Sequence, residues 1–187
     1  MILLALGVLL LSALHLVPAL PRLKAAVIAR AGQGAYGPAF GAVAILAMAL
    51  IVIGWRLSDA APVYEPPFWG HHANFGLTFL AFLCLGVFLF RGKLRQALRF
   101  PMGIAVVLWS SGHLLANGDL RSVVLFGGLL LSAILLIGVG MAQGARPSPE
   151  TRGGHDLLSL VMGAALYGVM TQLHPVIAGV PILSLTR

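Results

Sequence analysis

The chain has 187 residues, of which 59% are hydrophobic and only 9% are charged. A soluble globular domain carries about 25% charged residues, so this composition excludes a soluble protein, and the apolar content excludes a disordered one. The single cysteine, Cys84, excludes a disulfide scaffold and any CxxC metal or redox motif. An integral membrane protein embedded in the lipid bilayer remains. Its net charge of +7 then indicates orientation in the membrane rather than nucleic-acid binding.

Six apolar segments predict transmembrane helices, each of which needs about 20 mostly apolar residues. They cover about residues 1–20, 38–55, 68–90, 101–116, 122–141 and 156–183. The fourth segment is short, and two prolines interrupt the sixth. We interpret the first segment as a retained helix, because it has no basic region that would mark a signal peptide. The prediction is an all-α integral membrane protein, a bundle of about six helices in one domain over residues 1–187.

The basic residues predict the orientation of these helices. The first, third and fifth loops carry nine Lys and Arg residues, whereas the even loops and the C-terminus carry three. Cytoplasmic loops are enriched in Lys and Arg. We therefore expect the odd loops to face the cytoplasm and both termini to lie outside.

Histidines are the main candidates for function, because polar groups are costly inside a membrane. The predicted topology brings His71, His72, His113 and His174 from three helices to the outer leaflet. Imidazoles gathered at one depth suit a metal or haem site, so His113, His72 and His174 are candidate metal ligands. Each of them could instead cap a helix or bond a backbone carbonyl. His15 lies toward the cytoplasmic end and is assigned to a separate site.

The segment from Trp109 to Asp119 reads WSSGHLLANGD and is the most informative in the chain. Trp109, His113 and Asn117 are spaced i, i+4 and i+8, so they share one helix face. An aromatic ring, an imidazole and an amide would line a cofactor there, with Asn117 orienting an imidazole or a propionate. The alternative is a helix hairpin with an interfacial tryptophan, in which Gly118 ends the helix and Asp119 caps the next one.

The sixth segment has a second polar face. Tyr167, Thr171 and His174 are spaced i, i+4 and i+7, and Pro175 cannot donate to the Thr171 carbonyl. This face predicts either one wall of a pocket or polar contacts between helices. Small residues such as Gly128, Gly140, Gly163 and Gly168 predict close helix packing.

One pattern resembles a known family. Residues 99–127 read R-F-P-M-x6-W-x3-H-x3-N-G-D-x2-S-x3-F-G. This resembles the NnrU family of small bacterial membrane proteins, which also opens with a helix bearing a His followed by Pro, here His15 and Pro18. The pair His174-Pro175 is similar to the family as well.

The resemblance implies a multi-pass protein of the bacterial inner membrane that is associated with denitrification. Members serve the production of active nitrite and nitric oxide reductases, so a membrane respiratory reductase is the implied partner. The family is also similar to the enzyme that isomerises the 15-cis bond of ζ-carotene, which uses haem b with histidine ligation. Haem b is therefore the implied cofactor, and we expect His113 as one ligand with His72 or His174 opposite.

One residue departs from the family pattern. The family usually has Arg-His-Pro where this chain has Arg99-Phe100-Pro101. Phe100 cannot ligate iron, and it lies about 20 Å from His113 at 1.5 Å per helical residue. The substitution therefore weakens a cytoplasmic-side site with His15 more than an outer site with His113.

Several functions stay open from the sequence. The first is a haem-binding bundle, the second a membrane assembly factor without a cofactor, and the third a carotenoid-type cis/trans isomerase. A transporter fits less well, because the predicted helices carry no carboxylate pair at bilayer depth. Whether the chain is an enzyme stays undecided.

Overall fold

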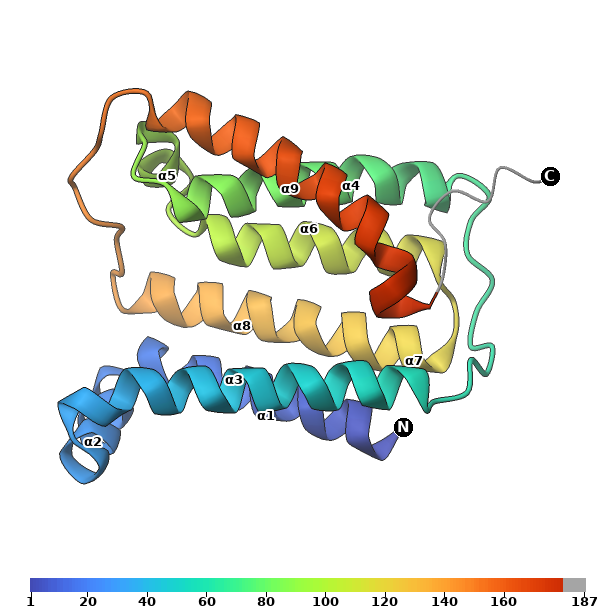
Figure 1. Ribbon diagram of the computed structural model, residues 1–187, viewed down its shortest axis with the longest axis horizontal. Helices are drawn as coiled ribbons and strands as arrows, with labels where there is room; N and C mark the ends of the chain where they lie inside the picture. The colour runs from blue at the N-terminus through green and yellow to red at the C-terminus, as the bar shows by residue number, and fades with distance from the viewer. Residues whose placement is uncertain (180–187) are drawn as a thin grey trace.

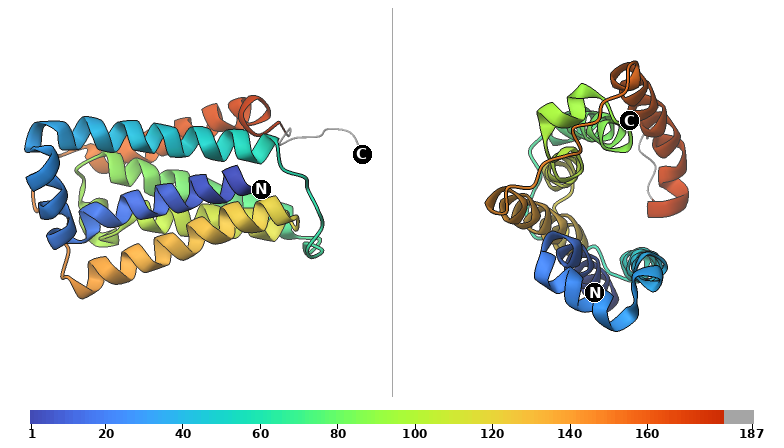
Figure 2. Two further views of the ribbon diagram at one scale, coloured as in Figure 1. Left: turned by 90° about the horizontal axis from the view of Figure 1, so that it is seen from below. Right: turned by 90° about the vertical axis from the view of Figure 1, so that its left-hand side faces the viewer.

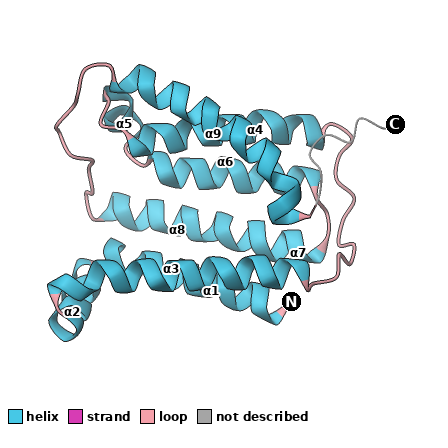
Figure 3. Ribbon diagram, in the orientation of Figure 1, coloured by secondary structure: helices cyan, strands magenta, loops and turns pink. Residues whose placement is uncertain are grey.

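A computed structural model describes residues 1–179, which form helices running back and forth between two ends (Figures 1 and 3). The elements are α1 (Ile2–Ala19), α2 (Pro21–Ala31), α3 (Gln33–Arg56), α4 (Gly70–Leu89), α5 (Lys93–Leu98), α6 (Pro101–Ala116), α7 (Leu120–Ser122), η1 (Val123–Gly127), α8 (Gly128–Ala142) and α9 (His155–Ala178). Within the described part, five helical stretches are long and apolar enough to cross a membrane, and α6 is a shorter apolar helix. The fold class predicted from the sequence, an all-α membrane bundle, is confirmed.

The helices form an incomplete ring, seen end-on in Figure 2. Neighbouring pairs are α3 with α1, α1 with α8, α8 with α6, α6 with α4, and α4 with α9. The ring closes between α3 and α9 only where both helices end. There the indole nitrogen of Trp55 donates to the Ala178 carbonyl at 3.2 Å, and the Arg56 guanidinium donates to the carbonyls of Val176 and Ile177. A cation at a helix C-terminus also interacts favourably with the helix dipole.

Glycines set the closest helix contacts. A Cβ atom at Gly163 in α9 would lie 2.6 Å from the Phe82 carbonyl oxygen and 2.8 Å from the Leu83 Cα, both in α4. Gly54 of α3 lies equally close to the backbone of Leu4 in α1. Gly168, by contrast, faces open space. The predicted role of small residues in close packing therefore holds at Gly163 and not at Gly168.

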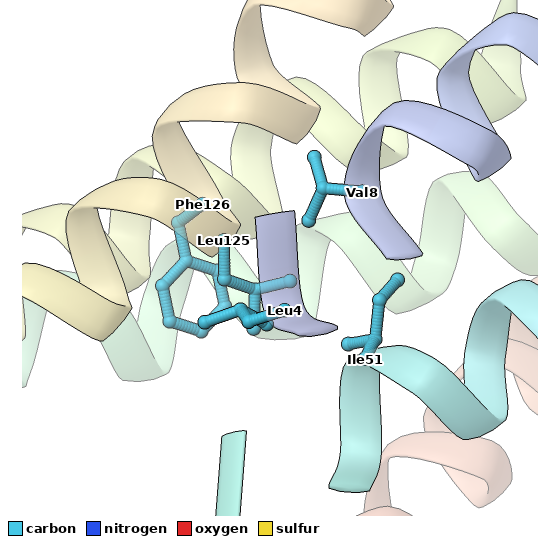
Figure 4. Packing of buried hydrophobic residues seen from close by; sticks show 5 residues of the cluster. All are labelled: Leu4, Val8, Ile51, Leu125 and Phe126. Atoms are coloured by element: carbon cyan, nitrogen blue, oxygen red, sulfur yellow. The ribbon is translucent and has the colours of Figure 1, made fainter. Parts of the chain in front are cut away.

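The best-buried hydrophobic cluster joins α1, α3 and η1 (Figure 4). It comprises Leu4, Val8, Ile51, Leu125 and Phe126. Leu125 and Phe126 belong to η1, a π-helical stretch within the fifth membrane span, and such stretches are frequent at functional sites.

The structure corrects several predicted bounds. The first loop contains the helix α2, and the third loop contains α5. The second span begins at Gln33 rather than at Pro38. Pro38 has no N–H to donate to the Gly34 carbonyl, but both residues are exposed, so the helix can continue through the proline. The fifth span begins at Leu120. The helix α9 continues through Pro175 to Ala178, and the predicted end at Leu183 lies outside the described residues.

The two ends of the bundle differ in charge as the topology requires. The helices α2 and α5 and the loop between α8 and α9 lie at one end, and the N-terminus and the loop between α3 and α4 lie at the other (Figure 1). The nine Lys and Arg residues of the odd loops therefore occupy the same end, which we take as cytoplasmic.

We predict that Gly163→Ala destabilises the protein by about 1–3 kcal/mol, because the new methyl group must push α9 away from the α4 backbone. The measurement is thermal unfolding in detergent. The control is Gly168→Ala in the same helix, which meets open space and removes a flexible glycine, so it should leave stability unchanged or slightly raised. Equal losses in both variants would contradict the proposed contact.

The orientation is tested by single cysteines in a Cys84→Ser background. Ala60→Cys, in the loop between α3 and α4, should react with a membrane-impermeant maleimide in intact cells. Ala29→Cys, in α2, should react only after the membrane is opened, because the positive-inside rule puts α2 in the cytoplasm. Both positions are exposed, so a reversed pattern would invert the topology rather than report burial.

Candidate functional site

A cavity of about 560 Å³ lies between α1, α6 and α8 at the basic end of the bundle. Ligand pockets of proteins usually measure about 300–1,000 Å³. Its α8 wall contains Leu129, Ala133 and Leu136, whereas Leu131 and Leu135 on the opposite face of α8 are 60% and 55% exposed. The cavity therefore lies on the face of α8 opposite to these exposed leucines.

Three arginines line the basic end of this cavity: Arg95 and Arg99 from α5 and its end, and Arg146 from the loop after α8. Within residues 1–179, no carboxylate lies within 4 Å of any of the three guanidinium groups. Arg99 donates from Nε to the Ala145 carbonyl at 2.8 Å, and this bond ties α5 to the loop that carries Arg146. Cations without a paired anion, next to an apolar cavity, favour an anionic ligand with an apolar body.

Arg99 also adopts an uncommon backbone conformation. Its φ of 58° makes it the non-glycine residue with positive φ in the described part of the chain. Such residues are costly and cluster at ligand-binding sites. The turn at Arg99 ends α5 and starts α6, so it places one guanidinium and the ring of Phe100 in the wall of the same cavity.

His15 is the imidazole that lines this cavity. Its Nδ1 lies 2.8 Å from the Leu11 carbonyl oxygen one turn back in α1. A carbonyl oxygen can only accept, so Nδ1 carries a proton, and in the neutral imidazole Nε2 then keeps its lone pair. A histidine that binds a metal almost always donates its other ring nitrogen to a carbonyl or carboxylate in this way. The ring is further held edge-on against Phe40 of α3, at 5.5 Å between centroids.

Phe100 lines the same cavity as His15. The Phe100 ring lies against Gly140 of α8, where an added Cβ would come within 2.7 Å of it, and the Arg99 guanidinium lies 5.0 Å from its centroid. Phe100 thus contributes a hydrocarbon ring to the cavity wall and no metal ligand. Met102 lines the cavity too and offers a thioether.

Trp109 lines the deep end of the cavity and also packs on His113, at 5.0 Å between ring centroids. The His113 ring is stacked on Phe126 at 4.4 Å, and its Nδ1 donates to the Trp109 carbonyl at 2.8 Å. The shared helix face predicted for Trp109 and His113 is therefore formed. Only Trp109 reaches the cavity; His113 is enclosed by aromatic rings toward the outer end.

The structure brings together some of the predicted outer histidines and not others. His174 in α9 lies close enough to His113 for electrostatic interaction. His72 lies exposed in the first turn of α4. Residues 1–179 contain no group of three or more His, Cys, Asp or Glu side chains placed to hold a metal ion.

The NGD part of the motif holds the outer loop. Asn117 donates from Nδ2 to the His113 backbone carbonyl at 2.9 Å. Asp119 caps α7 by accepting from the Ser122 amide and hydroxyl. Gly118 accepts from the amides of Val63 and Tyr64, at a backbone contact that leaves no room for a Cβ.

Sequence reasoning missed the three cavity arginines, which it used only for orientation. Arg95 and Arg99 are spaced i, i+4, so one short helix would place both on one face, and that spacing was the available signal. No such signal marks Arg146 in the sequence. Its loop is held at the cavity by the hydrogen bond from Arg99 to the Ala145 carbonyl, and these two residues are far apart in the sequence.

Comparison with family models gives a match over nearly the whole chain. A family model described as NnrU protein matches residues 3–182. No curated protein and no solved structure matches the chain.

The outer loop gives a prediction for Tyr64, whose hydroxyl donates to the carbonyl of Asn117 at 2.9 Å and contacts that of Leu114. Tyr64→Phe should lower the free energy of unfolding by about 0.5–1.5 kcal/mol. Burial raises the pKa of Tyr64, and the nearby Asp119 charge adds to this. The contribution should therefore be complete below about pH 10 and disappear as the pH rises through the higher pKa of the folded protein.

The control for Tyr64→Phe is Tyr36→Phe. The Tyr36 hydroxyl is buried and has no hydrogen-bond partner within residues 1–179, so its removal should not lower stability. Both variants are compared by thermal unfolding between pH 6 and pH 11. A Tyr64→Phe loss that stayed constant up to pH 11 would contradict the pKa argument.

Proposed function

Because the chain belongs to the NnrU family, we propose that it supports denitrification in the bacterial inner membrane by binding haem b in the cavity of His15. The observation that carries the proposal is the combination of one imidazole, apolar walls and three unpaired arginines in a single cavity of about 560 Å³. Haem b has the matching features: an iron that binds imidazole, an apolar macrocycle and two carboxylates.

Each part of the cavity has a role toward that group. His15 would bind the iron through Nε2, because Nδ1 is engaged with the Leu11 carbonyl. Arg95, Arg99 and Arg146 would hold the propionates at the cytoplasmic end. The side chains of Trp109 and Leu129 would exclude water from the deep part. When bound, haem supplies a redox-active iron whose potential depends on its axial ligands and its burial.

The cavity supports His15 as ligand more strongly than the outer histidines. His113 is stacked on Phe126 and packed on Trp109, and it does not line the cavity. The expectation of His113 with His72 or His174 remains the alternative ligand assignment, and the same experiment tests it.

We predict that the protein purified in detergent from haem-replete cells shows a Soret band and sharp α and β bands after dithionite reduction. His15→Ala should lower the bound haem at least about tenfold. Removing a residue that only hydrogen-bonds a metal ligand already costs about tenfold in metal affinity, and loss of the ligand itself should cost at least as much. His113→Ala is the matched control and should keep the haem. The measurement is the haem-to-protein ratio of monodisperse protein, so unfolded variants are excluded.

Three other results are informative. Loss of haem in His113→Ala but not in His15→Ala would move the site to the outer end. A colourless folded wild type would contradict haem binding and favour an assembly factor without a cofactor. If the wild-type protein binds haem, deletion of its gene in the host should lower the nitrite and nitric oxide reductase activities. The wild-type gene should restore these activities, whereas the His15→Ala variant should not.

A further inference from the structure

The helix α2 lies across the basic end of the bundle instead of along it (Figure 2). Because the long helices cross the membrane, a helix that runs across their ends lies in the plane of the membrane surface. It carries Arg22, Lys24 and Arg30, all exposed. Basic helices in this position are typical of binding to anionic lipid headgroups.

The charge of α2 is not balanced within the protein. Residues 1–58 contain no Asp or Glu. At the same end of the bundle, Glu150 pairs with Arg91 at 3.2 Å, and Asp156 accepts from the Leu94 amide at 2.9 Å. Within the described residues, no carboxylate lies within 4 Å of the three cations of α2. Their charge is therefore available to an external anion.

An apolar slot of about 150 Å³ lies directly beneath α2, between it and the ends of α1 and α3. Leu14 and Val17 of α1, Val27 of α2, and Phe40 and Val43 of α3 line it. A volume of 150 Å³ equals that of about five water molecules and accepts a small hydrocarbon, so it suits the end of one acyl chain.

The cationic and apolar features meet at one residue. Tyr36 lines the slot, and the Lys24 ammonium lies 5.8 Å from the centroid of its ring. A ligand that places its anionic group at Lys24 therefore has its apolar part at the entrance of the slot.

We propose that α2 and the slot beneath it bind one anionic phospholipid of the cytoplasmic leaflet. The headgroup phosphate binds the basic side chains of α2, and one acyl chain enters the slot between α1, α2 and α3. No residue lines both this slot and the His15 cavity, and the two are connected through the Phe40 ring of the slot, which packs against His15. The bound lipid would fix the angle of α2 to the membrane and with it the connection between the first two spans.

The test is native mass spectrometry of the full chain in detergent, titrated with phosphatidylglycerol or with phosphatidylcholine. Each basic residue near an anionic surface contributes about 1 kcal/mol, which is about fivefold in affinity. We expect the first phosphatidylglycerol to bind at least about fivefold more tightly than phosphatidylcholine. The triple variant Arg22→Gln, Lys24→Gln, Arg30→Gln should abolish this preference.

The matched control removes the same charge from the same end of the bundle. This control is the triple variant Arg91→Gln, Lys93→Gln, Arg152→Gln, whose substitutions lie outside α2. It should change the preference for phosphatidylglycerol over phosphatidylcholine by less than about twofold. A second variant, Ala39→Phe, fills the slot without changing charge and should weaken phosphatidylglycerol binding at least about threefold.

Each contrary result overturns the proposal. Equal binding of both lipids in the wild type excludes a site for an anionic headgroup. An equal loss in the control variant shows that general surface charge, not α2, gives the preference. Full competition by glycerol 3-phosphate, with no effect of Ala39→Phe, shows a site for a soluble phosphate and not for a lipid.

Discussion

The structure depends on the need to hydrogen-bond every polar group inside an apolar bundle. Backbone groups in a bilayer find no water, so the chain forms helices, and polar side chains bond back to their own helix. Ser12 donates to the Val8 carbonyl, His15 to that of Leu11, and His113 to that of Trp109. These bonds place a proton on Nδ1 of both histidines, so in the neutral form each ring has its lone pair on Nε2. What distinguishes the two is their surroundings: a cavity for His15 and packed aromatic rings for His113.

Helix packing then determines which polar groups can act. The α4–α9 contact is close because Gly163 has no side chain, and the Phe100 ring fits against α8 because Gly140 has none. The outer end is closed by Trp55 and Arg56 on the last carbonyls of α9. The basic end stays open, and there the arginines of α5 and of the loop after α8 surround the cavity. The bundle is therefore asymmetric, with the larger cavity and its three arginines at one end.

The haem and lipid proposals rest on the same physical pattern at different places. Each combines cations that no carboxylate neutralises with an apolar volume beside them. With five acidic residues against twelve basic ones, the chain cannot pair its cations internally. The excess charge that sets orientation in the membrane is thus also available for anionic groups, those of a cofactor at α5 and those of a lipid at α2.

The sequence by itself determined the class of protein, the approximate positions of the membrane spans and their connectivity, because hydropathy and span length follow directly from composition along the chain. It also determined the shared face of Trp109 and His113, since helical spacing is local. It misjudged α2 and α5, whose short basic sequences give a weak helical signal. Only the tertiary structure decided that His15, Phe100, Trp109 and the arginines meet in one cavity while His72 stays apart. That outcome depends on which helices become neighbours in the ring, and neighbour choice follows from glycine contacts and long-range hydrogen bonds that no periodicity records.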